Sequence, residues 1–142
     1  MKREVINRIY RKADADLARA WKELYRPEED VVLYTSCVSA RSAMYRYLVC
    51  LSMLSRKKGD IESIEKGKKP MNQLIKEAGK KYPEVAKMDF SAVHCKRKDI
   101  KNVLDNEETH FCNNTEMVNR CTNLANQLKE IVTERASKFV QP

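Results

Sequence analysis

Apolar residues recur every three or four positions through the first segment of the chain, from about Arg3 to Tyr25. This spacing puts them on one face of a helix, and they are Val5, Ile6, Ile9, Ala13, Leu17, Ala20, Trp21 and Leu24. The opposite sector of the same helix collects basic residues, which are Arg8, Arg11, Lys12, Arg19, Lys22 and Arg26. Because Pro27 cannot continue a helix, the segment predicts a first helix with one apolar and one basic side.

A second segment, from about Glu29 to Arg56, is apolar around most of its circumference. Residues 31–54 contain no Gly, no Pro and no acid, and Arg41 and Arg46 carry the only charges. With these arginines and several hydroxyl groups the segment is too polar to cross a membrane comfortably, yet it is too apolar to face water. One side of the helix is mixed, and it combines two valines with Arg41, Ser42, Tyr45, Arg46 and Ser52. We expect this helix to be buried on most sides, at the centre of a helical bundle.

The third helix is expected after a basic junction over residues 56–69. Pro70 suits the first helical position, and Gly79 is a plausible C-terminal stop. The apolar stripe between them is formed by Met71, Leu74, Ile75 and Ala78. Beyond it, Tyr82-Pro83 predicts a turn, followed by a short helical turn over residues 84–88.

The C-terminal third of the chain predicts one more long helix. Asp99 is placed to cap a short helix, and the last long helix is expected from about Thr115 to Phe139. Taken together, the elements predict an all-α fold, an antiparallel up-and-down bundle of four to five helices with a buried second helix. We see no internal repeat and no linker, so residues 1–142 are interpreted as a single domain.

Cysteine content and the N-terminal sequence indicate the compartment. The chain has five cysteines, an odd number, and its charged N-terminus lacks the apolar stretch of a secretory signal. We therefore expect a cytoplasmic protein with free thiols and no membrane association. Cys37 and Cys50, inside the apolar second helix, are expected to pack as small hydrophobic groups.

Basic residues exceed acidic ones, 28 against 20, which gives a formal net charge of +8. Such an excess is typical of proteins with an acidic partner such as RNA, but solvated lysine-rich faces produce it too. A nucleic-acid surface would combine the first helix with the junction, through Arg8, Lys12, Arg19, Lys22, Lys57, Lys58, Lys68 and Lys69. Aromatic residues are not interleaved with these positions, so the sequence signal for nucleic acid is electrostatic only.

Arg41 and Arg46 are the sharpest candidates for a binding site. A charge in the middle of an apolar helix is costly unless something compensates it. The arginines, together with Ser42 and Tyr45, therefore predict a site for an anionic ligand or a partner. The alternative is a salt bridge to an acid on a neighbouring helix, or exposure on the outer face of the bundle.

Metal binding and nucleophilic catalysis find little support in the sequence. His94-Cys95, His110-x-Cys112 and Cys121 match no zinc-site spacing. Cys95 lies beside His94 and three basic residues, but adjacent residues rarely orient a nucleophile and a base productively. The chain also lacks a phosphate-binding loop. We expect no metal and no cofactor.

The order of the expected helices resembles that of the HEPN domain, a four- to five-helix up-and-down bundle. The similarity spans roughly Glu4 to Phe139, and it depends on the first-helix run Ala13, Leu17, Ala20, Trp21 and Leu24, on the segment SARSAMYRYL, and on Met71-Asn72-Gln73-Leu74-Ile75. Active members of that family carry an Arg followed four to six residues later by a His, and they cleave RNA without a metal across a dimer. Neither His94 nor His110 has an Arg at that distance.

The resemblance implies a non-catalytic module that binds RNA, a nucleotide or a protein partner, as a homodimer formed through a mixed helical face. Two other functions stay open. One is a metal-independent ribonuclease with a non-standard site that combines Arg41, Tyr45 and Arg46 with a histidine. The other is a structural protein-interaction adaptor. The missing signature favours a binding module over an enzyme.

Overall fold

The computed structural model describes residues 2–25, 33–54, 71–90 and 115–136. Over these ranges the regular elements are helices, and none is a strand: α1 (Lys2–Leu24), α2 (Leu33–Leu54), α4 (Met71–Lys81), α5 (Pro83–Ala86) and α6 (Thr115–Arg135). The prediction of an all-α helical bundle is confirmed. None of the described helices is long and apolar enough to span a membrane.

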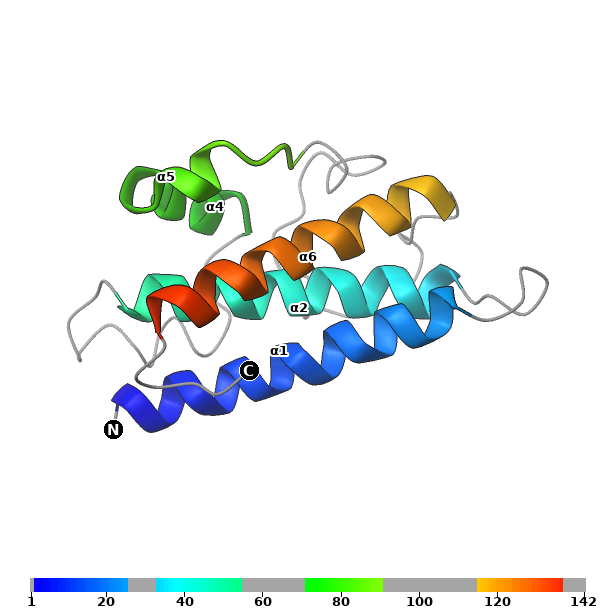
Figure 1. Cartoon of the computed structure of the whole chain (residues 1–142), viewed down its shortest axis with the longest axis horizontal. Helices are drawn as coiled ribbons and strands as arrows, with labels where there is room; N and C mark the ends of the chain where they lie inside the picture. Colours follow the sequence, from blue (N-terminus) through cyan, green and yellow to red (C-terminus); the bar gives the residue numbers. More distant parts are fainter. Residues whose placement is uncertain (1, 26–32, 55–70, 91–114, 137–142) are drawn as a thin grey trace.

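Helix α2 lies at the centre of the bundle, where α1, α4 and α6 all contact it. Figure 1 shows α2 between α1 and α6, with α4 and α5 packed to one side; α1 runs in the opposite direction to both other long helices. From Ser39 to Met53 every side chain except that of Arg46 is buried. The prediction of a buried second helix is therefore confirmed. Cys37 and Cys50 are buried within it, as expected, and neither forms a disulfide.

Helix α1 packs its predicted apolar face against α2. Five residues of that face are buried, Ile6, Ile9, Ala13, Leu17 and Ala20, and Val5 and Trp21 cover the edge of the core. The tyrosine ring of Tyr10 is fully buried as well and meets the ring of Tyr47 edge-on, with 5.9 Å between centroids. Burial of this apolar area is the main force that holds the two helices together.

The prediction that Gly79 ends its helix is wrong, because α4 continues to Lys81. The helix ends before Tyr82-Pro83, where Tyr82 is extended, with φ −123° and ψ 105°; a residue that precedes proline is disfavoured in helical conformation. Gly79 has a packing role, since its α-carbon faces the backbone of α5. A methyl group placed there would lie 3.6 Å from the α-carbon of Ala86.

Helix α6 covers the other side of α2. Its buried residues follow the predicted spacing of three and four: Val118, Cys121, Leu124, Ala125, Leu128, Ile131 and Val132. Several predicted elements lie outside the described residues, namely the basic junction, the helix capped by Asp99, and the part of the last helix beyond residue 136.

Candidate functional site

A cluster of polar side chains lies between α1 and α2, around the carboxylate of Asp16. Asp16 is 5% exposed. The hydroxyl of Ser42 donates a hydrogen bond to its Oδ2 at 2.8 Å, and Arg46 forms a salt bridge with the same oxygen. Arg19, one turn along α1, pairs with Oδ1 at 3.0 Å. A buried carboxylate thus has partners on both oxygens, which is what a charge inside a protein requires.

Two of the four residues predicted as a ligand or partner site, Ser42 and Arg46, meet in this cluster. Arg46 has the salt bridge to a neighbouring helix that was the alternative to a ligand. Arg41 and Tyr45 are buried, 6% and 1% exposed, and both make interactions of their own. The mixed side of α2 is thus covered within a single chain, so it offers little surface for a dimer; dimerisation itself stays a prediction.

A second polar cluster joins α1, α2 and α6. The hydroxyl of Tyr47 donates a hydrogen bond to Asp14 at 2.6 Å, and the ammonium group of Lys129 lies 3.3 Å from the same oxygen. Burial raises the pKa of the Tyr47 hydroxyl, and its hydrogen bond to Asp14 raises this pKa further. Nearby, the hydroxyls of Tyr10 and Thr133 are 3.0 Å apart. These bonds fix the relative positions of the three long helices.

Asp14 and Asp16 were not among the predicted site residues, although the sequence holds a signal for one of them. Asp16 comes three residues after Ala13 and four before Ala20, so it lies on the apolar face of α1. An acid on that face indicates a buried partner of opposite charge. Lys129 had no such signal, because it is one of many lysines and only the packing of α6 brings it to Asp14.

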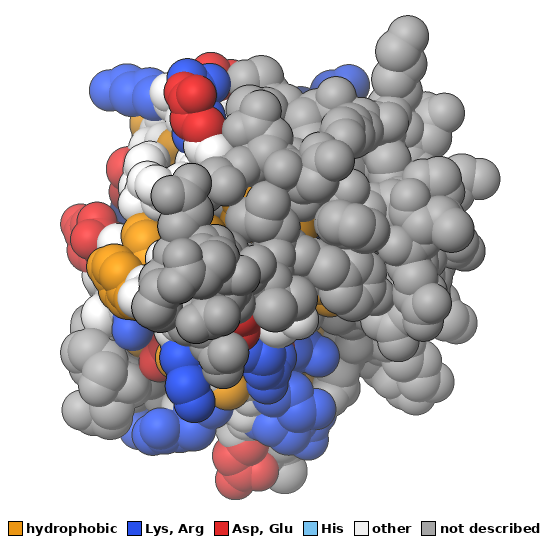
Figure 2. Space-filling view, turned by 90° about the vertical axis from the view of Figure 1, so that its right-hand side faces the viewer, with side chains coloured by type: hydrophobic (Ala, Val, Ile, Leu, Met, Phe, Trp, Pro, Cys, Tyr) orange, Lys and Arg blue, Asp and Glu red, His pale blue; other side chains and the backbone are white. Residues whose placement is uncertain are grey.

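The predicted nucleic-acid surface on the first helix is exposed as a continuous face. Arg8, Lys12, Arg19 and Lys22 are exposed, and so is Arg11 between them. Figure 2 shows Lys and Arg side chains gathered along its lower edge, the side on which Figure 1 places α1. The other four residues assigned to this surface, Lys57, Lys58, Lys68 and Lys69, lie outside the described residues.

Acidic and basic residues of α1 are sorted between the inside and the outside of the bundle. Asp16 and Glu23 are buried, and Asp14 is half-buried against Lys129. Glu4 is the acid of this helix that is exposed. Of the inward acids, Asp16 pairs with Arg19 of the outer face, and Asp14 pairs with Lys129 of α6. Arg11, Lys12 and Lys22 form no salt bridge with any described residue. This face therefore presents net positive charge to solvent.

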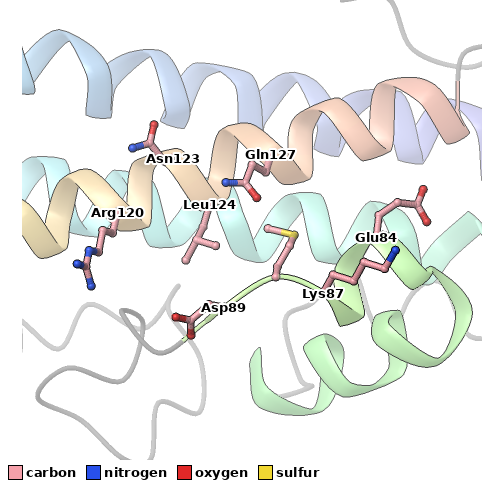
Figure 3. Close-up of a pocket in the computed structure, with 8 residues that line it drawn as sticks. Glu84, Lys87, Asp89, Arg120, Asn123, Leu124 and Gln127 are labelled. Atoms are coloured by element: carbon pink, nitrogen blue, oxygen red, sulfur yellow. The ribbon is translucent and has the colours of Figure 1, made fainter.

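A groove of about 540 Å³ lies between α6 and the segment around α5. Figure 3 shows the residues that line it: α6 contributes Arg120, Asn123, Leu124 and Gln127, and the segment around α5 contributes Glu84, Lys87 and Asp89. Two cations and two carboxylates balance each other here, and Arg120 and Glu84 already pair with Glu116 and Arg135. The pKa of Glu84 is lowered by a hydrogen bond from its own backbone and by Arg135. The groove thus concentrates no charge of one sign.

The histidines and cysteines considered as metal ligands or nucleophiles do not come together in the described part of the chain. His94, Cys95, His110 and Cys112 lie outside it, and Cys121 is buried. Among the residues of α1, α2, α4, α5 and α6 no three His, Cys, Asp or Glu side chains cluster as metal ligands. These helices bring together ion pairs, and the basic residues on the outside of α1 are exposed.

Comparison with known proteins returns no relative: no protein-family model matches the chain, and neither a curated protein nor a solved structure is significantly similar to it.

Proposed function

We propose that the chain is a non-catalytic, HEPN-like helical module that binds RNA, and that the outer face of α1 contacts the RNA backbone. The observation that carries the proposal is the sorting of charge on α1. Its exposed face holds Arg8, Arg11, Lys12, Arg19 and Lys22, while Asp14 and Asp16 pair with residues of α2 and α6 and Glu23 is buried. A solvated surface for solubility alone would not need this separation, because acids and bases mixed on one face are equally soluble.

The length of the basic face suits a polyanion better than a single small anion. At a rise of about 1.5 Å per residue, the 14 steps from Arg8 to Lys22 cover about 21 Å along the helix. Several phosphates of one strand fit along that distance, and each contact releases condensed counterions. Binding of this kind positions a nucleic acid without reading its sequence.

The arrangement of the two central arginines supports a binding module over a ribonuclease. Arg41 is buried in the bundle, and Arg46, although partly exposed, is paired with Asp16. A substrate phosphate would have to compete with Asp16 for Arg46. An RNA strand on α1 would contact flexible Lys and Arg side chains, which attract phosphate but provide no general base at neutral pH.

The test is a binding titration of fluorescently labelled single-stranded RNA at two salt concentrations. One variant combines Arg11→Gln, Lys12→Gln and Lys22→Gln on the outer face of α1. The matched control combines Lys76→Gln, Lys80→Gln and Lys81→Gln, three exposed lysines of α4. Each triple variant loses three positive charges, so the formal net charge falls from +8 to +5 in both.

We expect the α1 variant to bind much more weakly, and its plot of log affinity against log salt to be flatter by about 2, since each single-strand phosphate contact contributes about 0.7. The α4 variant should bind as the wild type does. Equal losses in both variants would show that net charge, and not the α1 face, governs binding. A gel of the same RNA checks the non-catalytic part, because accumulation of cleavage products would contradict it.

A further inference from the structure

Tyr25 is the large hydrophobic side chain that the described helices leave exposed: 79% of its surface is accessible to solvent. It directly follows α1, and its backbone N–H donates a hydrogen bond to the carbonyl of Trp21 at 3.0 Å, so the helical path continues through it. An aromatic ring held in water gains nothing from the hydrophobic effect. The exposure of this ring therefore calls for an explanation other than core packing.

The ring of Tyr25 is held in place by the ring of Trp21. The two stack with 5.6 Å between centroids and 15° between planes. Trp21 itself is half-buried and packs against the core of the bundle. One face of the Tyr25 ring is therefore supported by a fixed indole, and the other is open. A ligand that stacks on the open face would lose little side-chain entropy in the protein.

Tyr25 also lies at the end of the basic face of α1. Alternate steps of four and three residues define one line along the helix. This line contains five exposed residues: Arg11, Ala15, Ala18, Lys22 and Tyr25. The guanidinium group of Arg11 lies at one end of this line. The ammonium group of Lys22 and the ring of Tyr25 lie at the other end. The two alanines between them leave room for a strand to approach the helix closely.

We propose that Tyr25, supported by Trp21, stacks an unpaired base of a single-stranded nucleic acid whose phosphates follow the basic face of α1. This inference depends on the proposed function, because it assigns the class of nucleic acid that the same face binds. Cationic side chains along a backbone with aromatic rings for the bases are the chemistry of single-strand binding proteins. A double helix buries its bases in the stack and offers the ring no partner.

Trp21 provides the readout, because it is the one tryptophan of the chain. Its fluorescence is titrated with single-stranded RNA, with an abasic strand of the same length and charge, with the matching RNA duplex, and with single-stranded DNA. Tyr25→Ala removes the ring, and Tyr25→Phe keeps it as the control. Because Tyr25 is exposed, both variants should keep the helical circular-dichroism spectrum of the wild type.

We expect the base-containing single strands to bind about 5- to 100-fold more tightly than the abasic strand, and to change the Trp21 emission. Tyr25→Ala should lower the affinity of single strands to that of the abasic strand, while Tyr25→Phe stays within about twofold of the wild type. Tighter binding of RNA than of DNA would indicate an additional contact to the ribose. Tyr25 would still be the residue that stacks on the base.

The outcomes separate this inference from the proposed function. If abasic, duplex and base-containing strands bind the wild type equally, the stacking site is overturned, whereas the polyanion-binding face of α1 stands. If none of the strands binds at moderate salt, both proposals fall. The comparison of base-containing with abasic strands uses the wild type alone, so it decides the question even if a variant misfolds.

Discussion

Asp16 and Arg46 form a salt bridge across the α1–α2 interface, at a point where Asp16 is 5% exposed. Ser42 donates a second hydrogen bond to the same carboxylate oxygen. The pair thus connects the acid on the apolar face of one helix to the arginine in the middle of the other. Removing Asp16 leaves Arg46, whose side chain is 26% exposed, without this partner.

Asp16→Ala should therefore lower the free energy of unfolding by about 1.5–3 kcal/mol, the usual contribution of hydrogen bonds to a charged group, because water can partly solvate the remaining arginine. Combining it with Arg46→Met should restore part of the loss, since the uncompensated arginine is then absent. Urea unfolding of the wild type, both single variants and the double variant gives the coupling energy. Strictly additive effects of the two substitutions would show that the pair contributes nothing to stability. As a control, Glu130→Ala at an exposed site of α6 should change the free energy of unfolding by less than about 0.5 kcal/mol.

Alkaline pH should destabilise the protein through Tyr47. Its pKa is raised from the ordinary value of 10.0, first by burial and then by Asp14. Above about pH 10 the unfolded tyrosine releases its proton while the folded one keeps it. The unfolded state then binds fewer protons, so stability present below pH 10 is lost as the pH rises. This residue contributes a slope of up to about 1.4 kcal/mol per pH unit.

Tyr47→Phe should make that alkaline slope shallower by up to about 1.4 kcal/mol per unit above pH 10. Urea titrations at several pH values between 8 and 11 measure it. Asp14 keeps Lys129 as a partner in this variant, so the stability at pH 8 should fall by only about 1 kcal/mol. An unchanged alkaline slope would show that the Tyr47 hydroxyl ionises equally in the folded and unfolded states.

Gly79→Ala should stabilise the protein. The added methyl group would lie 3.6–3.9 Å from atoms of Ala86, which is ordinary van der Waals contact. Alanine in the interior of a helix is favoured over glycine by about 0.5–1 kcal/mol. Thermal unfolding should show a higher midpoint for this variant. Gly79→Leu should lower the midpoint, because a long side chain would separate α4 from α5. A lower midpoint for Gly79→Ala would contradict the packing of Gly79 against α5.

The buried thiols should react only when the bundle opens. Cys37, Cys50 and Cys121 are buried and form no disulfide, and burial raises the pKa of the Cys50 thiol. Since the thiolate is the nucleophile, iodoacetamide at pH 8 should label Cys50 at least about 100-fold more slowly in the folded protein than in urea. Mass spectrometry of the peptides reports each site separately. Fast labelling of Cys50 in the folded state would show that α2 is not closely covered by α1.

Helical periodicity was enough to predict the fold class and the central position of α2. The steps of three and four along α1 depend only on which side chains avoid water, so burial confirmed them at Ile6, Ile9 and Leu17. Gly79 was predicted wrongly because glycine serves both to end helices and to admit a close neighbour. The sequence does not distinguish these two roles. The structure does, because it places Ala86 next to Gly79.

The polar clusters show where prediction from periodicity stops. The position of Arg46 indicated that it needs compensation, but periodicity defines a face and not the register of one helix against another. The position of Asp16 on the apolar face of α1 distinguishes it among the 20 acidic residues, but its pairing with Arg46 follows from the packing of the two helices. The same limit applies to Tyr25, whose exposure and stacking on Trp21 depend on how α1 ends.

The central position of α2 has a consequence for synthesis of the chain on the ribosome. Helix α1 precedes α2, but α6, which covers its other side, ends 81 residues after Leu54, at Arg135. At a synthesis rate of about 5–20 residues per second, roughly 4–16 s pass between the synthesis of α2 and that of α6. During this interval the nascent chain exposes apolar surface that chaperones bind. Ribosome-bound chains stalled before α6 should therefore be digested within α2 by protease. Chains that carry an added C-terminal linker, which brings α6 out of the ribosome, should resist.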